Sequence, residues 1–341
     1  MTMTGPDDQR LMKETSLVRG SLGRMQITRR ARGKGWSFHQ ADGSVIRDPA
    51  TIDRLNGLAV PPAYTDVRYA VSPRAHLQAI GTDAAGRLQY RYHPDWERIR
   101  EARKARRLVA LAAAQPRLRR QLRQALKADA PDRDFAAAAC IALVMQTAIR
   151  AGGLTSETTF GHRGATTLLK SNVACEGDRL VLSFRGKGGK QIARGTRSAA
   201  LCRALAALRA LPGRHIFQYR GDDGTVRRLG AADANARLKG LAGADVSLKD
   251  FRTLNASRQV AAELAAIEPA ASASGRKRQV KAAVAAASEV LANTPTVCRK
   301  SYVHEAIVEA FESGRLKRLK ARPRSKAARP DLVAAMLAPA A

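Results

Sequence analysis

The pattern of hydrophobic residues changes near residue 100, and this change limits the possible folds more than any other feature. Before it, short β-like segments such as 77–80 and 88–92 are separated by turns. After Pro94 the chain becomes rich in Ala, Leu and Arg, which is typical of helices. The sequence therefore predicts an α+β protein with a small β-rich N-terminal domain and a larger, mainly α domain. The expected boundaries are 1–100 for the first domain, 101–312 for the second and 313–341 for a basic C-terminal tail.

Local signals predict the elements of the N-terminal part. Residues 1–35 are polar and basic, and we expect them to be loosely ordered. Asp42-Gly43 lies between the apolar segments 36–40 and 45–46, a pattern typical of a hairpin. Further strands are expected at 67–71, 77–80 and 88–92, the last two joined by a turn at 83–86.

The second part contains one hairpin among helices. Asp134 is the expected N-cap of an apolar helix that runs to Ile149, directly before Arg150. Strands at 179–184 and 191–194 flank a glycine-rich turn that contains Lys187. The remaining helices are expected at 198–211, 231–241, 248–267, 276–291 and 297–312.

Charge indicates the partner. The 341 residues contain 60 Lys and Arg against 29 Asp and Glu, a formal net charge of +31. Such a charge on a folded chain indicates a polyanionic partner, with nucleic acid favoured over an anionic membrane surface. The segment 315–329 carries eight cations and no acid, and we expect a flexible arm that follows phosphates.

The sequence shows none of the usual motifs for metals, nucleotides or membranes. It contains no run of about 18 apolar residues and no apolar signal segment at its start, so we expect a cytoplasmic protein. The four cysteines are far apart, and we expect four buried free thiols: Cys140, Cys175, Cys202 and Cys298. Without a phosphate-binding glycine loop or a cluster with metal-ligand spacing, we expect no cofactor, metal or nucleotide.

Several scattered residues share one chemical logic. A tyrosyl oxygen such as that of Tyr302 attacks a phosphodiester readily only if cations stabilise its phenolate, because its ordinary pKa is about 10. Arginines such as Arg150 and Arg252 suit the charge of the transition state, and Lys187 suits protonation of the leaving oxygen. Each residue alone also has an ordinary explanation: a helix-terminal arginine, a solvated lysine, a tyrosine packed on a helix.

Taken together, these segments resemble the type IB DNA topoisomerases of bacteria and poxviruses. The resemblance covers about residues 20–315 and is most specific at 293–304, then at 249–253 and 81–92. Shorter segments agree in order and spacing at 149–150, 164–168 and 184–187. The family fold implied is a C-shaped clamp on duplex DNA that nicks one strand, lets it rotate and reseals it without ATP or metal.

The resemblance also assigns roles. Tyr302 would form a 3′-phosphotyrosyl link, Arg150 and Arg252 would hold the scissile phosphate, and Lys187 would be the general acid, relayed with Lys249. Asn293 stands nine residues before the tyrosine, where many relatives carry His; its amide can donate the same hydrogen bond without charge. The implied DNA-binding residues are Arg87, Gln89, Tyr90, Tyr92, Lys190, Arg299 and Lys300, although the tyrosines could instead pack within the β-domain.

Three departures from the family pattern lie near these residues. Ala292 replaces a glycine that is usual before the Asn, Gly152-Gly153-Leu154 replaces a more polar stretch, and His162-Arg163 resembles a small insertion. We expect these departures to affect the geometry around Arg150 and not the catalytic residues themselves.

Two other functions remain open. A tyrosine recombinase shares the Arg/Lys/Tyr chemistry, but recombinases usually carry His where this chain has Lys249. A DNA-compacting protein without catalysis needs only the charge of +31 and would form no covalent adduct. The resemblance favours a topoisomerase that acts on double-stranded DNA, as a monomer associated with the nucleoid and away from membranes.

Overall fold

The computed structural model describes residues 12–13, 15–128, 131–321 and 331–337. The chain divides into two compact units, Met1–Lys104 and Ala105–Ala341. Helix α3 (Pro94–Ala125) begins in the first unit and continues into the second. The structure confirms an α+β fold in which a β-rich N-terminal region precedes a mainly helical one.

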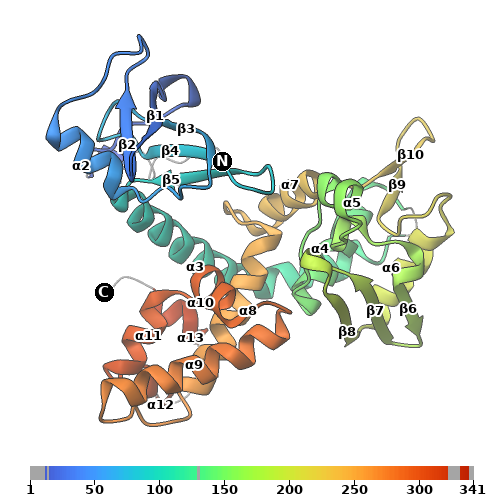
Figure 1. Ribbon diagram of the computed structural model, residues 1–341. Helices are drawn as coiled ribbons and strands as arrows, with labels where there is room; N and C mark the ends of the chain where they lie inside the picture. Colours follow the sequence, from blue (N-terminus) through green and yellow to red (C-terminus); the bar gives the residue numbers. More distant parts are fainter. Residues whose placement is uncertain (1–11, 14, 129–130, 322–330, 338–341) are drawn as a thin grey trace. The chain divides into compact units, whose positions relative to one another are not determined.

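The N-terminal unit is built on one antiparallel sheet of five strands, in the order β2-β1-β3-β4-β5 (Figure 1). The strands are β1 (Ile27–Arg32), β2 (Gly35–His39), β3 (Thr65–Tyr69), β4 (Leu77–Thr82) and β5 (Leu88–Tyr92). Helix α2 (Pro49–Gly57) starts at Asp48, whose carboxylate accepts a hydrogen bond from the Thr51 N–H. The short turn η1 (Leu22–Arg24) precedes the sheet. The strands predicted at 67–71, 77–80 and 88–92 are confirmed.

One prediction for this unit was wrong, and another is confirmed only over a short segment. The basic segment before residue 35 contains strand β1, because Arg29 is held within the fold: its guanidinium donates to the carbonyls of Val60 and Pro61 and lies over the Trp36 ring, 3.9 Å from its centroid. The hairpin predicted around Asp42-Gly43 forms, but its returning segment is short: the Gln40 N–H donates to the Ser44 carbonyl, the Ile46 N–H donates to the Phe38 carbonyl, and Val45 forms an isolated bridge with His39. The main partner of β2 is therefore β1.

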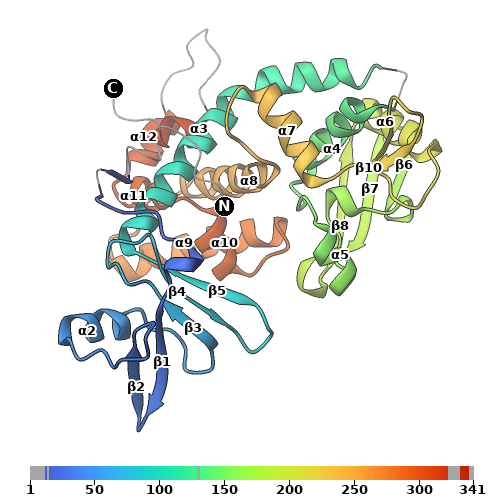
Figure 2. The ribbon, with the colours of Figure 1, turned by 90° about the horizontal axis from the view of Figure 1, so that it is seen from above.

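The second unit is organised around helix α4 (Arg133–Thr147), which is buried on nearly all sides. Figures 1 and 2 show the small sheets and α5–α6 on one side of it, with α8–α13 gathered on the other. The N-cap is Asp132, which accepts from the Phe135 N–H at 2.8 Å, and not the predicted Asp134. Asp134 instead pairs with Arg237. The helices are α5 (Leu154–Phe160), α6 (Ala199–Ala210), α7 (Ala231–Ala242), α8 (Leu248–Leu264), α9 (Ala273–Val290), α10 (Pro295–Tyr302), α11 (Glu305–Glu312), α12 (Arg315–Ala321) and α13 (Leu332–Leu337).

The predicted hairpin is confirmed and has a third strand. The sheet has the order β6-β7-β8 and consists of β6 (Val173–Glu176), β7 (Arg179–Arg185) and β8 (Gln191–Arg197). The turn η4 (Lys187–Gly189) joins β7 to β8. A separate pair is formed by β9 (Gln218–Arg220) and β10 (Val226–Arg228), and the turns η2 (Ala165–Thr167) and η3 (Lys170–Asn172) precede β6.

The helix expected over 297–312 is two helices. Helix α10 ends at Tyr302, Val303 is extended and buried, and the His304 ring caps α11 by accepting from the Ala306 N–H. The carbonyl of Tyr302 accepts a hydrogen bond from the buried hydroxyl of Ser257 at 3.0 Å. The chain therefore turns directly after Tyr302 because distant side chains satisfy its backbone.

The C-terminal part and the cysteines also differ from expectation. The arm predicted from residue 315 is wrong for 315–321, where α12 forms and Leu316 is buried in the core; 322–330 lie outside the described residues. Helix α13 buries Val333 and Met336 in the same core. Cys175 is exposed and the other three cysteines are buried.

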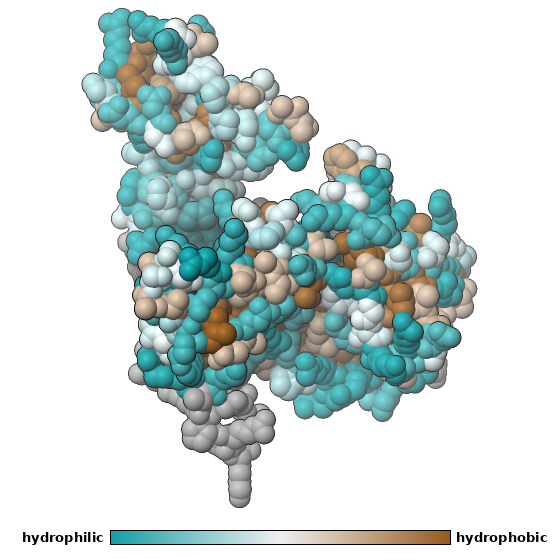
Figure 3. All heavy atoms as spheres, turned by 60° about the horizontal axis from the view of Figure 1, so that its bottom comes forward, coloured by the Kyte–Doolittle hydropathy of each residue, from teal (hydrophilic) through white to brown (hydrophobic). Residues whose placement is uncertain are grey.

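One face of the molecule is mostly polar. Hydrophilic residues cover most of the face in Figure 3, and hydrophobic residues on it form small separate groups. Among the described helices, none is long and apolar enough to cross a membrane.

Candidate active site

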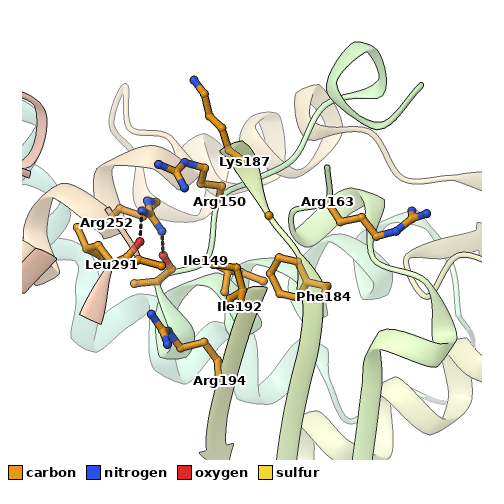
Figure 4. A pocket seen from close by; sticks show the side chains of 12 residues that line it. Ile149, Arg150, Arg163, Phe184, Lys187, Ile192, Arg194, Arg252 and Leu291 are labelled. Carbon is orange, nitrogen blue, oxygen red and sulfur yellow. Dashed lines mark hydrogen bonds between the residues drawn. The ribbon is translucent and has the colours of Figure 1, made fainter. Parts of the chain in front are cut away.

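Several segments of the second unit meet around a pocket at the end of α4. They are the residues that follow α4, Arg163 before η2, the hairpin formed by β7, η4 and β8, the N-terminal half of α8, and the junction between α9 and α10 (Figure 4). The lining residues are Ala148, Ile149, Arg150, Arg163, Phe184, Gly186, Lys187, Ile192, Arg194, Arg252, Leu291 and Ala292. The pocket thus joins a hydrophobic floor to five cationic side chains.

Arg252 is buried and is held by backbone oxygens. Its Nη1 donates to the Ala148 carbonyl and its Nη2 to the Leu291 carbonyl, the latter at 3.0 Å (Figure 4). The side chain lies on α8 and is 4% exposed. Its Nε is buried and has no partner among the described residues. Burial lowers the pKa of Arg252, but an arginine remains charged in proteins.

Arg150 is held by an amide. Its Nη2 donates to the Asn293 Oδ1 at 2.5 Å, across 143 residues of sequence. The Asn293 Nδ2 is buried and has no partner among the described residues. A buried N–H without a partner is unfavourable, and both this group and the Arg252 Nε are in that state among the described residues.

A left-handed alanine lies shortly before each member of the Arg150–Asn293 hydrogen bond. Ala148 has φ +52° and ends α4, and Ala292 has φ +50° directly before Asn293. A left-handed residue other than glycine is strained by about 1–2 kcal/mol. Because Ala292 stands where the family usually has glycine, this chain carries backbone strain directly before Asn293.

The segment after Arg150 crosses another segment closely. The Ala165 N–H donates to the Arg150 carbonyl at 2.7 Å. A Cβ on Gly164 would lie 2.4 Å from the Gly152 nitrogen, so only glycine fits there. Gly152 is one of the residues that depart from the family pattern. Its close approach to Gly164 and its φ of +88° both favour glycine at this position.

Tyr302 lies at the end of α10 and is 7% exposed. The Arg252 guanidinium carbon is 5.1 Å from the centroid of its ring. Burial raises the pKa of Tyr302, but the positive charge of Arg252, followed by that of Arg150 and Lys249, outweighs burial, so the pKa is lower than usual. The surroundings of Tyr302 therefore favour its phenolate more than water does.

The two candidate lysines are exposed. Lys187 extends from the hairpin turn at the rim of the pocket (Figure 4), and Lys249 lies in the first turn of α8. Neither ammonium has a hydrogen bond or an ion pair with the described residues. The structure thus brings Tyr302, Arg252 and Lys249 within electrostatic range and places Lys187 at the same pocket as Arg252.

The other predicted DNA-binding residues of this unit lie further out. Lys190 follows the turn η4 and is exposed, as is Lys300 on α10. Arg299 forms an ion pair with Glu305 of α11. Its charge is therefore already partly balanced before any ligand binds.

The predicted DNA-binding residues of the N-terminal unit lie on β5, at the edge of the sheet, or in the turn before it. Asp83 accepts hydrogen bonds from the Arg87 Nε at 2.9 Å and from the Gln89 Nε2 at 2.8 Å. The rings of Tyr90 and Tyr92 are stacked, with centroids 6.2 Å apart. Tyr90 is 46% exposed, whereas Tyr92 packs against His76, Trp96 and the Arg100 guanidinium. The packing alternative therefore fits Tyr92 better than Tyr90.

The sequence did not reveal several residues of the site. Arg194 on β8 lines the pocket and donates to the carbonyls of Glu289 and Val290. Arg163 also lines it, but its guanidinium points away from Arg150 toward Glu157 (Figure 4). No local pattern marks either arginine, because both are placed by contacts across the fold. No group of three or more His, Cys, Asp or Glu able to hold a metal occurs in the described parts of the chain.

Comparisons with known proteins relate both units to DNA topoisomerases of type I. Residues 35–83 match the family model described as the N-terminal domain of bacterial DNA topoisomerase IB. Residues 94–327 match the model described as the catalytic core of eukaryotic DNA topoisomerase I. A DNA topoisomerase 1B of Acanthamoeba polyphaga mimivirus is 26% identical over 294 residues, which cover 84% of this chain and 88% of that protein.

Proposed function

Because this chain belongs to the type IB DNA topoisomerase family and acts as a DNA topoisomerase, we propose that Tyr302 is its nucleophile. The phenolate oxygen attacks the scissile phosphorus, the P–O5′ bond breaks, and a 3′-phosphotyrosyl link and a 5′-hydroxyl strand result. The phenol proton passes to water, and the lowered pKa of Tyr302 reduces the cost of that loss. Resealing is the reverse step, so no ATP is consumed.

The observation that carries this proposal is the pair of buried donors without partners. The Arg252 Nε and the Asn293 Nδ2 lie on two side chains that are already held in place by other hydrogen bonds. Preorganised donors of this kind stabilise charge on the non-bridging oxygens of a phosphoryl transition state. Arg150, fixed by Asn293, supplies a second guanidinium.

Proton transfer to the leaving group requires a third kind of residue. We assign it to Lys187, which lines the pocket and whose ammonium has no partner among the described residues. The proton moves from its Nζ to the departing O5′ atom. Lys249 supports the same step as a nearby positive charge, which already acts on Tyr302.

DNA binding belongs to both units in this proposal. Gln89, Tyr90 and Arg87 contact the duplex from β5 and its turn, and Lys190 and Lys300 contact phosphates from the catalytic unit. A clamp of the two units around double-stranded DNA, monomeric action and a location at the nucleoid are part of the same proposal.

Relaxation of supercoiled plasmid with EDTA present and ATP absent tests the assignment. We expect the wild-type protein to relax positive and negative supercoils and to form a covalent DNA adduct, and Tyr302→Phe to do neither while it still binds DNA. Tyr219→Phe, a half-buried tyrosine on β9, is the matched control and should remain active. Activity of Tyr302→Phe would place the chemistry on another residue. Binding without relaxation by the wild-type protein would support a compacting protein instead.

A further inference from the structure

The turn that carries Lys187 is contacted from outside the hairpin by His162. The Gly189 N–H donates to the His162 Nε2 at 3.1 Å. The backbone N–H can only donate, so the His162 Nε2 is the acceptor of this bond. The family function proposed above assigns no role to this histidine.

The turn by itself is weakly constrained. Gly188 and Gly189 both have positive φ, +75° and +74°, a conformation that glycine adopts at little cost. The hairpin closes with the Gly186 N–H donating to the Lys190 carbonyl at 2.8 Å, and the Gly189 N–H also donates to the Gly186 carbonyl at 3.1 Å. These bonds hold the turn together but do not fix its tip relative to Arg150.

His162 connects the tip of the turn to helix α5. Its own N–H donates to the Ser156 carbonyl of α5, and its ring stacks on Phe160, with centroids 5.6 Å apart. The next residue, Arg163, donates its N–H to the Arg185 carbonyl of β7 at 2.8 Å. The loop after α5 therefore holds the hairpin at its last strand residue and again at its tip.

Helix α5 is in turn fixed by one carboxylate. Glu157 accepts hydrogen bonds from the Arg163 Nη1 at 2.9 Å, from the His215 Nε2 at 2.7 Å and from the Arg228 Nη2 at 2.6 Å. Burial of Glu157 raises its pKa, but these three partners outweigh burial and hold the pKa at about 2. A continuous series of contacts thus runs from the body of the unit to Gly189.

We propose that His162 is a positioning residue that sets the place of the Lys187 ammonium by holding the Gly189 N–H. The inference rests on the proposed role of Lys187 as the general acid. Loss of the acceptor leaves Lys187 chemically intact but lets the turn move. Because general acid catalysis contributes about 10²–10⁴-fold, we expect a part of it, about 10–100-fold, to be lost.

The test compares two leaving groups in single-turnover cleavage. In one DNA substrate the scissile linkage has its ordinary 5′ oxygen, and in the other a sulfur replaces that oxygen. A thiol has a pKa near 8.5, so a thiolate departs without a proton, whereas an alkoxide does not. His162→Ala should slow cleavage of the oxygen substrate about 10–100-fold and that of the sulfur substrate less than about threefold.

Conservative and control variants complete the design. In His162→Gln the amide Oε1 can accept from the Gly189 N–H, so this variant should recover most of the lost rate on the oxygen substrate. Lys187→Ala should show a larger defect on oxygen and the same rescue by sulfur. Melting temperature and DNA affinity, measured for every variant, should change little.

The outcomes distinguish the positioning role of His162 from the general-acid role of Lys187. If sulfur rescues Lys187→Ala but not His162→Ala, or if His162→Ala cleaves both substrates at the wild-type rate, the positioning role is refuted. If sulfur does not rescue Lys187→Ala, the general-acid assignment itself is wrong. Failure of His162→Gln to recover the rate while it remains folded would also overturn the inference.

Discussion

Replacement of Asn293 by Asp should make the protein more stable and nearly inactive. In the free protein the Arg150 Nη2 donates to the Asn293 Oδ1 at 2.5 Å, and the Nδ2 of the same amide is buried without a partner among the described residues. Asn293→Asp keeps the shape of the side chain. It changes the unpaired donor into an acceptor and adds a negative charge beside a guanidinium.

The structure determines the sign and approximate size of both effects. An unpaired buried N–H costs about 1–3 kcal/mol, and a charge-assisted hydrogen bond is about twice as strong as a neutral one. We therefore expect about 1–2 kcal/mol of added stability, or about 2–8 °C in melting temperature for a domain of this size. Loss of one preorganised donor to a phosphoryl oxygen costs about 10²–10³-fold in rate, and the new charge repels the phosphate in addition.

Thermal melting without DNA and single-turnover cleavage measure the two effects separately. Asn293→Ala is the matched control, because it removes the donor and also leaves Arg150 without its acceptor, so both melting temperature and rate should fall. Wild-type cleavage by Asn293→Asp would show that Nδ2 is not a phosphate donor. A lower melting temperature for Asn293→Asp would refute the electrostatic part of the reasoning.

Two further changes test the surroundings of the site. Ala292→Gly removes the strain of a left-handed alanine at φ +50°, worth about 1–2 kcal/mol, but also increases the entropy of the unfolded chain. The free energy of unfolding, measured in urea, should therefore rise by up to about 1 kcal/mol. A clear decrease would contradict the strained geometry. Glu157→Gln should cost about 1–3 kcal/mol near neutral pH, because Glu157 accepts from three side chains. Since the pKa of Glu157 is about 2 when folded against a usual 4.5, its stabilisation is fully present above pH 4.5 and is lost as the pH falls toward 2. The stability gap between Glu157→Gln and the wild-type protein should therefore close over that range, and a gap independent of pH would contradict the ionised carboxylate.

Elements whose signals are local could be predicted from the sequence. The turn at Asp83–Gly86 between β4 and β5 follows from an acidic residue and a glycine at the required positions, and the carboxylate of Asp83 indeed accepts from the N–H groups of Ala85 and Arg87. The hairpin around Lys187 has the same character, because Gly188 and Gly189 allow the positive φ that the turn needs.

Helix ends near the site could not be predicted, because distant residues determine them. Ala148 is a good helix former, yet it leaves α4 in a left-handed conformation, and its carbonyl accepts from Arg252 of α8. The apolar periodicity over 297–312 continues across Val303, yet α10 ends at Tyr302. The Tyr302 carbonyl accepts a hydrogen bond from the Ser257 hydroxyl. Local periodicity carries no information about such contacts.

The same reasoning explains why the sequence predicted the charged residues of the site but not how they are held. A positive side chain in a fold is often paired with an acid, which would reduce its use for a phosphate. Here Arg252 is held by two backbone carbonyls and Arg150 by an amide, and neither forms an ion pair within the described residues. Both arginines are thus fixed by neutral acceptors and keep their full charge. That charge lowers the pKa of Tyr302 in the free protein, and it would be partly neutralised if an acid replaced Asn293. Neutral acceptors are therefore the physical condition that lets one cluster both activate the tyrosine and bind the phosphate.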